Sequence, residues 1–169
     1  AVASTTLPPA AYAQHFETVS MCLSKGLGAP VGSLLVSSDQ QLIDRIRRFR
    51  RMYGGAMRQA GILAACGIVS LNKMVDRLAE DHARAKKLGK AINEIPGCSV
   101  DLSTVQTNMV FANTVRPASE WQKAMAAQKV HFSTYGANRF RCVLHADIDD
   151  AKLEQTLTAF KTVAPALAG

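Results

Sequence analysis

Two short apolar runs flank a turn near the start of the chain. The runs, Val19–Leu23 and Val31–Val36, are predicted as two buried strands from their apolar residues. The segment between them is rich in residues that let a backbone turn tightly, namely Gly26, Gly28, Pro30 and Gly32. The first 15 residues, with many alanines and a Pro-Pro pair, predict a loop and a short helix.

Three later segments have the spacing of helices. Residues 39–52 carry an apolar stripe, and the polar residue at 38 or 39 suits an N-cap. Residues 57–71 are rich in small side chains, which permit close backbone approach in an interior or at a subunit contact. Residues 73–95 place apolar side chains at steps of three and four, and Pro96-Gly97 ends this helix.

The pattern changes after Pro96, where short apolar runs alternate with helical spacing. Strands are predicted at 99–102, 109–112, 130–132 and 141–144, and helices at 119–128 and 149–164. The alternation predicts an α+β module of about 70 residues, joined to the first part by a hinge near residue 96.

One lysine stands at the end of the first predicted strand, where a cation is costly. Lys25 must reach water, pair with a charge or lose its proton. In the last case its amine becomes a nucleophile that can form a Schiff base. Taken alone, a lysine in a glycine-rich turn is most often a solvated surface residue. A phosphate loop fits less well, because in that motif the lysine follows the glycines.

Three segments, in this order, resemble one enzyme family. They are residues 24–33 (Ser-Lys-Gly-Leu-Gly-Ala-Pro-Val-Gly-Ser), residues 54–65 (Gly-Gly-Ala-Met-Arg-Gln-Ala-Gly-Ile-Leu-Ala-Ala) and residues 77–83 (Arg-Leu-Ala-Glu-Asp-His-Ala). Similar segments occur in the L-threonine aldolases, which are pyridoxal-phosphate (PLP) enzymes of the β-eliminating lyase family and of fold type I. The resemblance runs from about Phe16 to the end of the chain.

The resemblance implies an α/β fold of the aspartate-aminotransferase type. Residues 1–57 would form the end of the large, mainly parallel PLP-binding domain, residues 58–96 connecting helices, and residues 97–169 a small C-terminal α+β domain. The implied reaction is cleavage of the Cα–Cβ bond of L-threonine or L-allo-threonine to glycine and an aldehyde.

The resemblance also implies the residues that bind the cofactor. Lys25 would hold pyridoxal 5'-phosphate as an internal aldimine. Arg58, in its Gly-Gly-Ala-Met-Arg-Gln context, would reach the cofactor phosphate of the neighbouring subunit, because an arginine fork suits a phosphate dianion. Arg51 stands where the family often has a lysine that assists the phosphate. The family expectation is therefore a homo-oligomer, either a dimer or a tetramer.

A further arginine is implied near the end of the chain. Arg141 begins a segment, Arg-Cys-Val-Leu-His-Ala-Asp, that resembles the family's Arg-x-x-x-His-x-Asp strand, whose arginine binds the substrate carboxylate. Arg139 lies two residues earlier and competes for this role, but the motif favours Arg141. His82, His145 and Asn108 are expected to be structural.

One departure from the family concerns length. Its proteins are about twice as long as this chain of 169 residues, so we expect the chain to be the C-terminal half of such an enzyme. The implied aspartate for the pyridine nitrogen, the phosphate loop and the ring-stacking histidine cannot be assigned in residues 1–15. The missing N-terminal half is then a partner, and without it we expect little or no activity.

Composition and charge leave several alternatives open. The net charge of +7 suits nucleic acid, but the arginines concentrate on the helix predicted over 39–52 without any nucleic-acid motif, so no nucleic-acid partner is expected. No run approaches the roughly 18 apolar residues of a membrane span. The 4 cysteines are widely spaced, which predicts reduced thiols in the cytoplasm and no metal site. An alanine racemase, a β-eliminating lyase and a non-catalytic dimerising remnant remain alternatives to the aldolase.

Overall fold

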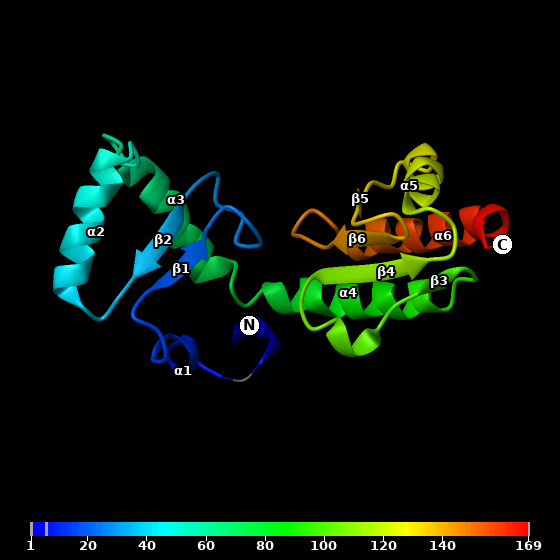
Figure 1. Ribbon diagram of the computed structural model, residues 1–169, viewed down its shortest axis with the longest axis horizontal. Helices are drawn as coiled ribbons and strands as arrows, with labels where there is room; N and C mark the ends of the chain where they lie inside the picture. Colours follow the sequence, from blue (N-terminus) through cyan, green and yellow to red (C-terminus); the bar gives the residue numbers. More distant parts are fainter. Residues whose placement is uncertain (1, 6, 169) are drawn as a thin grey trace. The chain divides into compact units, whose positions relative to one another are not determined.

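The computed structural model describes residues 2–5 and 7–168, and the chain divides into two compact units, residues 1–77 and 78–169 (Figure 1). The division lies at residue 77 rather than at the hinge predicted near residue 96. The reason is that the helix α4 (Leu78–Asn93) buries Ala85, Leu88 and Ile92 in the core of the second unit. A sequence can predict that a helix has an apolar face, but not which sheet covers it.

In the described residues of the N-terminal unit there are two strands, two short helices and two longer helices. After the short helices η1 (Val2–Ser4) and α1 (Pro9–Ala13), strand β1 (Val19–Cys22) pairs in antiparallel fashion with β2 (Ser33–Val36). Helices α2 (Gln40–Met52) and α3 (Gly61–Lys73) follow. Asp39 is the N-cap of α2, and its Oδ1 accepts hydrogen bonds from the backbone N–H groups of Gln41 (2.8 Å) and Leu42 (3.1 Å).

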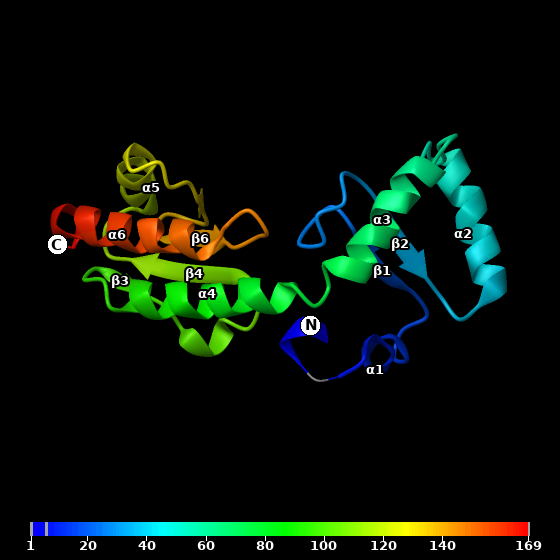
Figure 2. The ribbon, with the colours of Figure 1, turned by 180° about the vertical axis from the view of Figure 1, so that it is seen from behind.

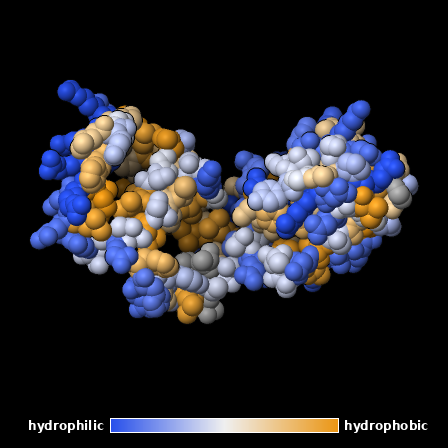
Figure 3. Space-filling view, viewed as in Figure 1, coloured by the Kyte–Doolittle hydropathy of each residue, from blue (hydrophilic) through white to orange (hydrophobic). Residues whose placement is uncertain are grey.

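The strands β1 and β2 were expected to be buried, but this prediction is wrong for the described residues. Their residues are exposed or partly exposed, and the two strands pair only with each other instead of lying inside a larger sheet. The exposed apolar side chains of this unit colour its surface orange in Figure 3. All described strand pairs are antiparallel, so the parallel sheet of a large domain is not represented among them.

Helix α3 begins later than predicted, at Gly61 instead of residue 57. Residues 58–60 form a turn in which Gln59 has a φ of 53°, outside the helical region. One of the small residues of α3, Gly67, permits close packing. A Cβ on Gly67 would lie 3.0 Å from Leu23 Cδ1, so the glycine lets α3 approach the residue that follows β1.

The C-terminal unit is a four-stranded antiparallel sheet with helices on one face. Its strands are β3 (Cys98–Ser99), β4 (Met109–Thr114), β5 (Ser133–Thr134) and β6 (Arg139–Val143), in the order β3-β4-β6-β5. Between β3 and β4 lies the short helix η2 (Leu102–Thr104). The helices are α4, α5 (Ala118–Ala127) and α6 (Asp150–Leu167), and Figures 1 and 2 show α4 and α6 on the same side of the sheet.

The alternating residues of β4 and β6 explain the two faces of this sheet. Val110, Ala112 and Phe140 are fully buried beneath the helices, and Phe140 stacks on Phe160 of α6 with ring centroids 5.8 Å apart. Residues at the odd-numbered positions point to the other face, since successive side chains of a strand alternate. That open face carries Phe111, Arg139 and Arg141.

The strand predicted at residues 130–132 is displaced to residues 133–134. Lys129 has a φ of 61° at the end of α5, and the backbone N–H of Val130 still bonds to Met125 O (3.0 Å). The carbonyl of Phe132 accepts from Gln122 Nε2 (2.8 Å) instead of from a neighbouring strand. Pairing with β6 therefore starts only at Ser133.

Across residues 2–5 and 7–168, no helix combines the length and the apolar character that crossing a membrane requires.

Candidate active site

Lys25 lies on the turn between β1 and β2, and local hydrogen bonds define this turn. The carbonyl of Lys25 accepts from Gly28 N (2.9 Å), and the carbonyl of Leu23 accepts from Ala29 N (3.0 Å). Gly28 has a φ of 70°, a left-handed conformation that glycine adopts without a Cβ penalty. The turn is anchored by Leu23, Leu27 and Ala29, which are buried.

The side chain of Lys25 is exposed on this anchored turn. Within residues 2–5 and 7–168 its amine has no hydrogen-bond or ion-pair partner. The amine is therefore accessible to a carbonyl compound while the backbone beneath it is held in place.

Arg51 and Arg58 lie on either side of a second glycine turn. Arg51 is in the last turn of α2, and its carbonyl accepts from Gly54 N (3.2 Å), where Gly54 has a φ of 74°. Arg58 lies four residues after Gly54 and precedes α3. Both side chains are exposed, and the described part of the chain offers neither guanidinium group an acidic partner. Two cations at one turn suit a phosphate dianion.

Arg141 lies on β6, in the C-terminal unit, and its surroundings differ from those of the other arginines. The side chain is half-buried, and its Nε is buried with no hydrogen-bond partner among the described residues. A buried guanidinium N–H without an acceptor is costly, so this atom is a candidate for binding an anionic ligand.

Arg139, the competing arginine, is held differently on the same strand. Its guanidinium carbon lies 4.7 Å from the ring centroid of Phe111 and 5.9 Å from that of Tyr135. This contact was missed by sequence reasoning. The alternation of β4 puts Phe111 on the open face, but only the register between β4 and β6 brings it to the arginines.

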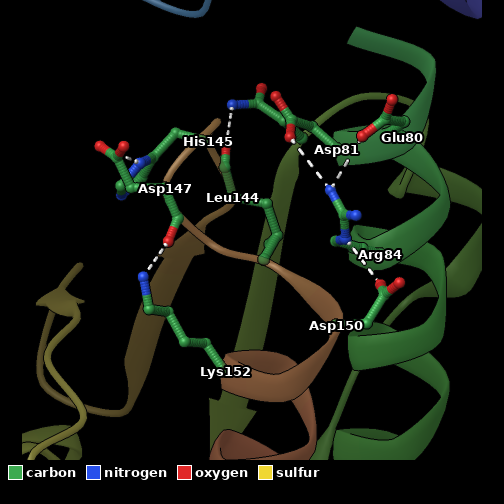
Figure 4. Close-up of polar contacts among 9 residues, drawn as sticks. Glu80, Asp81, Arg84, Leu144, His145, Asp147, Asp150 and Lys152 are labelled. Carbon is green, nitrogen blue, oxygen red and sulfur yellow. Dashed lines mark hydrogen bonds and ion pairs between the residues drawn. The ribbon is translucent and has the colours of Figure 1, made fainter. Parts of the chain in front are cut away.

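The loop after β6 is fixed by polar contacts (Figure 4). Asn108 Nδ2 donates to Leu144 O (2.7 Å), which fits the structural role expected for this asparagine. His145 Nδ1 lies 3.5 Å from Asp147 Oδ2, and Lys152 Nζ donates to Asp147 O (2.7 Å). His82 is half-buried on α4.

A charged pair links α4 to the start of α6 beside this loop. Arg84 Nε donates to Asp150 Oδ1 (2.8 Å), and Figure 4 also shows Arg84 between Glu80 and Asp81. The hydrogen bond from Arg84 holds the pKa of Asp150 below its usual value. Lys87 and Glu154 form a second ion pair between the same helices.

The cysteines carry free thiols throughout the described residues. Burial raises the pKa of both Cys98 and Cys142 to about 12, so these two stay protonated at neutral pH. Within residues 2–5 and 7–168 no group of His, Cys, Asp and Glu side chains could hold a metal ion.

A groove of about 860 Å³ opens in the C-terminal unit between α6, residues 128–132 and the end of β6. None of the predicted site residues lines it. The groove is therefore not part of the candidate site.

The predicted site residues thus form two groups. Lys25, Arg51 and Arg58 belong to the N-terminal unit, and Arg141 belongs to the C-terminal unit. Together they fit pyridoxal phosphate and an amino-acid substrate chemically: an amine for the cofactor aldehyde, two guanidinium groups for its phosphate and one for the substrate carboxylate. The orphaned Nε of Arg141 supports the last of these assignments.

Solved structures share the fold of this chain over less than half of their own length. A Listeria monocytogenes protein named as an L-allo-threonine aldolase has a TM-score of 0.79 and 16% identity, over 95% of this chain and 48% of its own. A serine palmitoyltransferase from Sphingomonas wittichii has a TM-score of 0.70 and 16% identity, over 91% of this chain and 41% of its own. The fold is therefore that of the aspartate-aminotransferase type, as predicted.

The chain belongs to the beta-eliminating lyase family, which matches residues 1–115. Low-specificity L-threonine aldolase 1 of Arabidopsis thaliana is 35% identical over 149 residues, covering 86% of this chain and 41% of the relative. The low specificity L-threonine aldolase of Escherichia coli K12 is 38% identical over 143 residues, covering 84% of this chain and 41% of the relative. The resemblance to threonine aldolases is confirmed, and the chain spans less than half the length of these relatives.

Proposed function

We propose that this chain supplies the lysine, phosphate-binding and carboxylate-binding groups of a PLP-dependent aldolase. The enzyme would cleave L-threonine or L-allo-threonine to glycine and acetaldehyde. The observation that carries the proposal is the exposed, unpaired amine of Lys25 on an anchored turn, in a chain of this family. The rest of the subunit, of the kind that the longer relatives contain, is the proposed partner for full activity.

Each residue has a distinct part in this proposal. Lys25 Nζ would hold the cofactor aldehyde, and Arg58 with Arg51 would bind the cofactor phosphate. In this arrangement Arg58 would act across a homo-oligomer, reaching the cofactor of a neighbouring subunit. Arg141 would bind the substrate carboxylate through paired N–H donors, which orients the Cα–Cβ bond.

The chemistry balances without a further reactant. The bound cofactor supplies an electron sink for the pair left at Cα when the Cα–Cβ bond breaks. The β-hydroxyl loses its proton as the aldehyde forms, and Cα gains a proton as glycine forms. The products together have the composition of the substrate. A cytoplasmic location is proposed with this function, because the described cysteines are free thiols.

The test is an assay of acetaldehyde and glycine formation with added pyridoxal phosphate. It compares the chain alone with the chain plus the N-terminal part of the Escherichia coli relative. Equal amounts of both products, lost in Lys25→Ala but kept in the control Lys73→Ala, are expected; Lys73 is an exposed lysine of the same unit. The substrates are L-threonine, L-allo-threonine and, in a separate mixture, L-alanine. Racemisation of the added alanine, or ammonia release from threonine in place of glycine, would assign one of the alternative reactions. No product in either mixture would favour a non-catalytic, dimerising protein.

A further inference from the structure

Two arginines share the open face of the C-terminal sheet, and they differ in their contacts. Arg139 and Arg141 are two residues apart on β6, so their side chains point the same way. A carboxylate approaching this face meets two guanidinium groups with the same chemistry. Some feature of the structure must therefore determine which of the two guanidinium groups binds the carboxylate.

The strand register puts Phe111 beside both arginines. Leu144 N donates to Asn108 O (2.8 Å), which makes that pair hydrogen-bonded. Hydrogen-bonded and non-hydrogen-bonded pairs alternate along an antiparallel ladder, so the pair three positions further on, Phe111 and Arg141, is non-hydrogen-bonded. Opposite side chains lie closest in pairs of this kind. The same phenyl ring lies under Arg139, 4.7 Å from its guanidinium carbon.

Tyr135 completes an aromatic platform for Arg139. Its ring meets that of Phe111 edge to face, with centroids 5.3 Å apart, and lies 5.9 Å from the Arg139 guanidinium carbon. The negative faces of these rings attract the cation, which restricts the orientations of the Arg139 side chain. Arg141 in contrast keeps a buried Nε with no partner among the described residues.

We propose that Phe111 is a positioning residue, which stacks Arg139 and so leaves carboxylate binding to Arg141. This inference rests on the proposed function, because it explains how one substrate carboxylate finds a single orientation. If Arg139 were released, the carboxylate would bind in two places two residues apart along β6, and the substrate would have two positions relative to the reacting bond.

The experiment follows the Nε–Hε NMR signals of the two arginines in the full chain. Arg139→Lys and Arg141→Lys variants assign the signals, and sodium acetate is the carboxylate probe, with sodium chloride at equal ionic strength as the control. In the unaltered chain we expect acetate to shift the Arg141 signal in a saturable way and the Arg139 signal no more than chloride does. In Phe111→Leu we expect both signals to respond.

Further variants separate positioning from a general loss of structure. Phe111→Tyr keeps a ring, and Met109→Leu changes an exposed residue on the same face of the same strand, so both should behave like the unaltered chain. Tyr135→Leu removes the second, more exposed ring and should release Arg139 in part, even if Phe111→Leu does not fold. In an Arg139→Gln background, Phe111→Leu should leave the Arg141 response unchanged.

The possible failures have different meanings. The inference would be overturned if acetate shifted the Arg139 signal of the unaltered chain more than chloride does. It would also be overturned if the Arg139 signal of Phe111→Leu responded to acetate no more than to chloride. Either result would leave the proposed function standing. A response of neither arginine would overturn both the inference and the carboxylate role of Arg141. Loss of the Lys25-dependent reaction in the product assay would refute the proposed function by a separate measurement.

Discussion

Gly97 provides a quantitative test of how the C-terminal unit is held together. Its φ is 80°, and a Cβ added to it would lie 3.0 Å from Ala168 Cα and 3.2 Å from the backbone oxygens of Leu167 and Ala168. The atoms that it would meet are backbone atoms at the end of α6, which cannot move aside like a flexible side chain. Gly97→Ala should therefore combine backbone strain with a steric clash.

The chain offers a matched control that carries only the first of these effects. Gly136 has a φ of 97°, but a Cβ there would meet nothing within 4 Å. A left-handed conformation costs an alanine about 1–2 kcal/mol, which is the expected effect of Gly136→Ala. Overpacking against the backbone adds about 1–3 kcal/mol, so we expect Gly97→Ala to destabilise the unit by about 2–5 kcal/mol. Replacing glycine by alanine lowers the conformational entropy of the unfolded chain equally in both variants. This contribution therefore cancels when the stabilities of the two variants are compared.

Trp121 makes the assay specific for this unit. It is the single tryptophan of the chain, and it is fully buried in the core of residues 78–169. Its fluorescence during urea unfolding reports this unit without a contribution from the other. At about 2 kcal/mol per molar urea, the midpoint of Gly97→Ala should lie about 1 M or more below that of the unaltered chain. Equal midpoints for Gly97→Ala and Gly136→Ala would refute the close approach of Gly97 to the end of α6.

Three further predictions follow from local contacts. Asp39→Ala removes the acceptor for two backbone N–H groups of α2 and should lower the stability of that helix by about 1 kcal/mol, measured by circular dichroism during unfolding. Exposed Cys22 should react with a thiol reagent well before buried Cys142, whose pKa is raised to about 12; equal rates in the native chain would contradict the burial. Because the folded pKa of Asp150 is lowered, its contribution to stability is present above the unfolded value of about 3.9 and is lost as pH falls through the folded value. Asp150→Asn should thus be less stable at neutral pH, with the difference vanishing in acid; a constant difference would exclude the Arg84 pairing as its cause.

Local signals in the sequence predicted much of the fold. Asp39 is the N-cap of α2, as the polar residue before an apolar periodic segment predicted. Prediction was wrong where a contact distant along the chain decides the structure. Residues 130–132 have strand-like composition, but a hydrogen bond from Gln122 and the turn at Lys129 keep them out of the ladder.

The candidate site likewise contains residues that the sequence predicted and a contact that it could not predict. Lys25, Arg58 and Arg141 were predicted from segments that resemble those of a family, and their roles stay predictions. The stack of Arg139 on Phe111 could not be predicted, because it depends on which residues of β4 and β6 lie opposite each other. Alternation along a single strand gives the face but not the cross-strand neighbour.

Lys25 is the residue proposed to bind the aldehyde of pyridoxal phosphate. The direct measurement is reduction with borohydride after incubation with the cofactor, followed by peptide mapping of the modified lysines, with and without the N-terminal part of the Escherichia coli relative. We expect an absorption band of the bound cofactor before reduction and a reduced cofactor adduct on Lys25 after it, both absent in Lys25→Ala. Modification spread evenly over the exposed lysines, or no trapped cofactor even with the complementary part present, would contradict it.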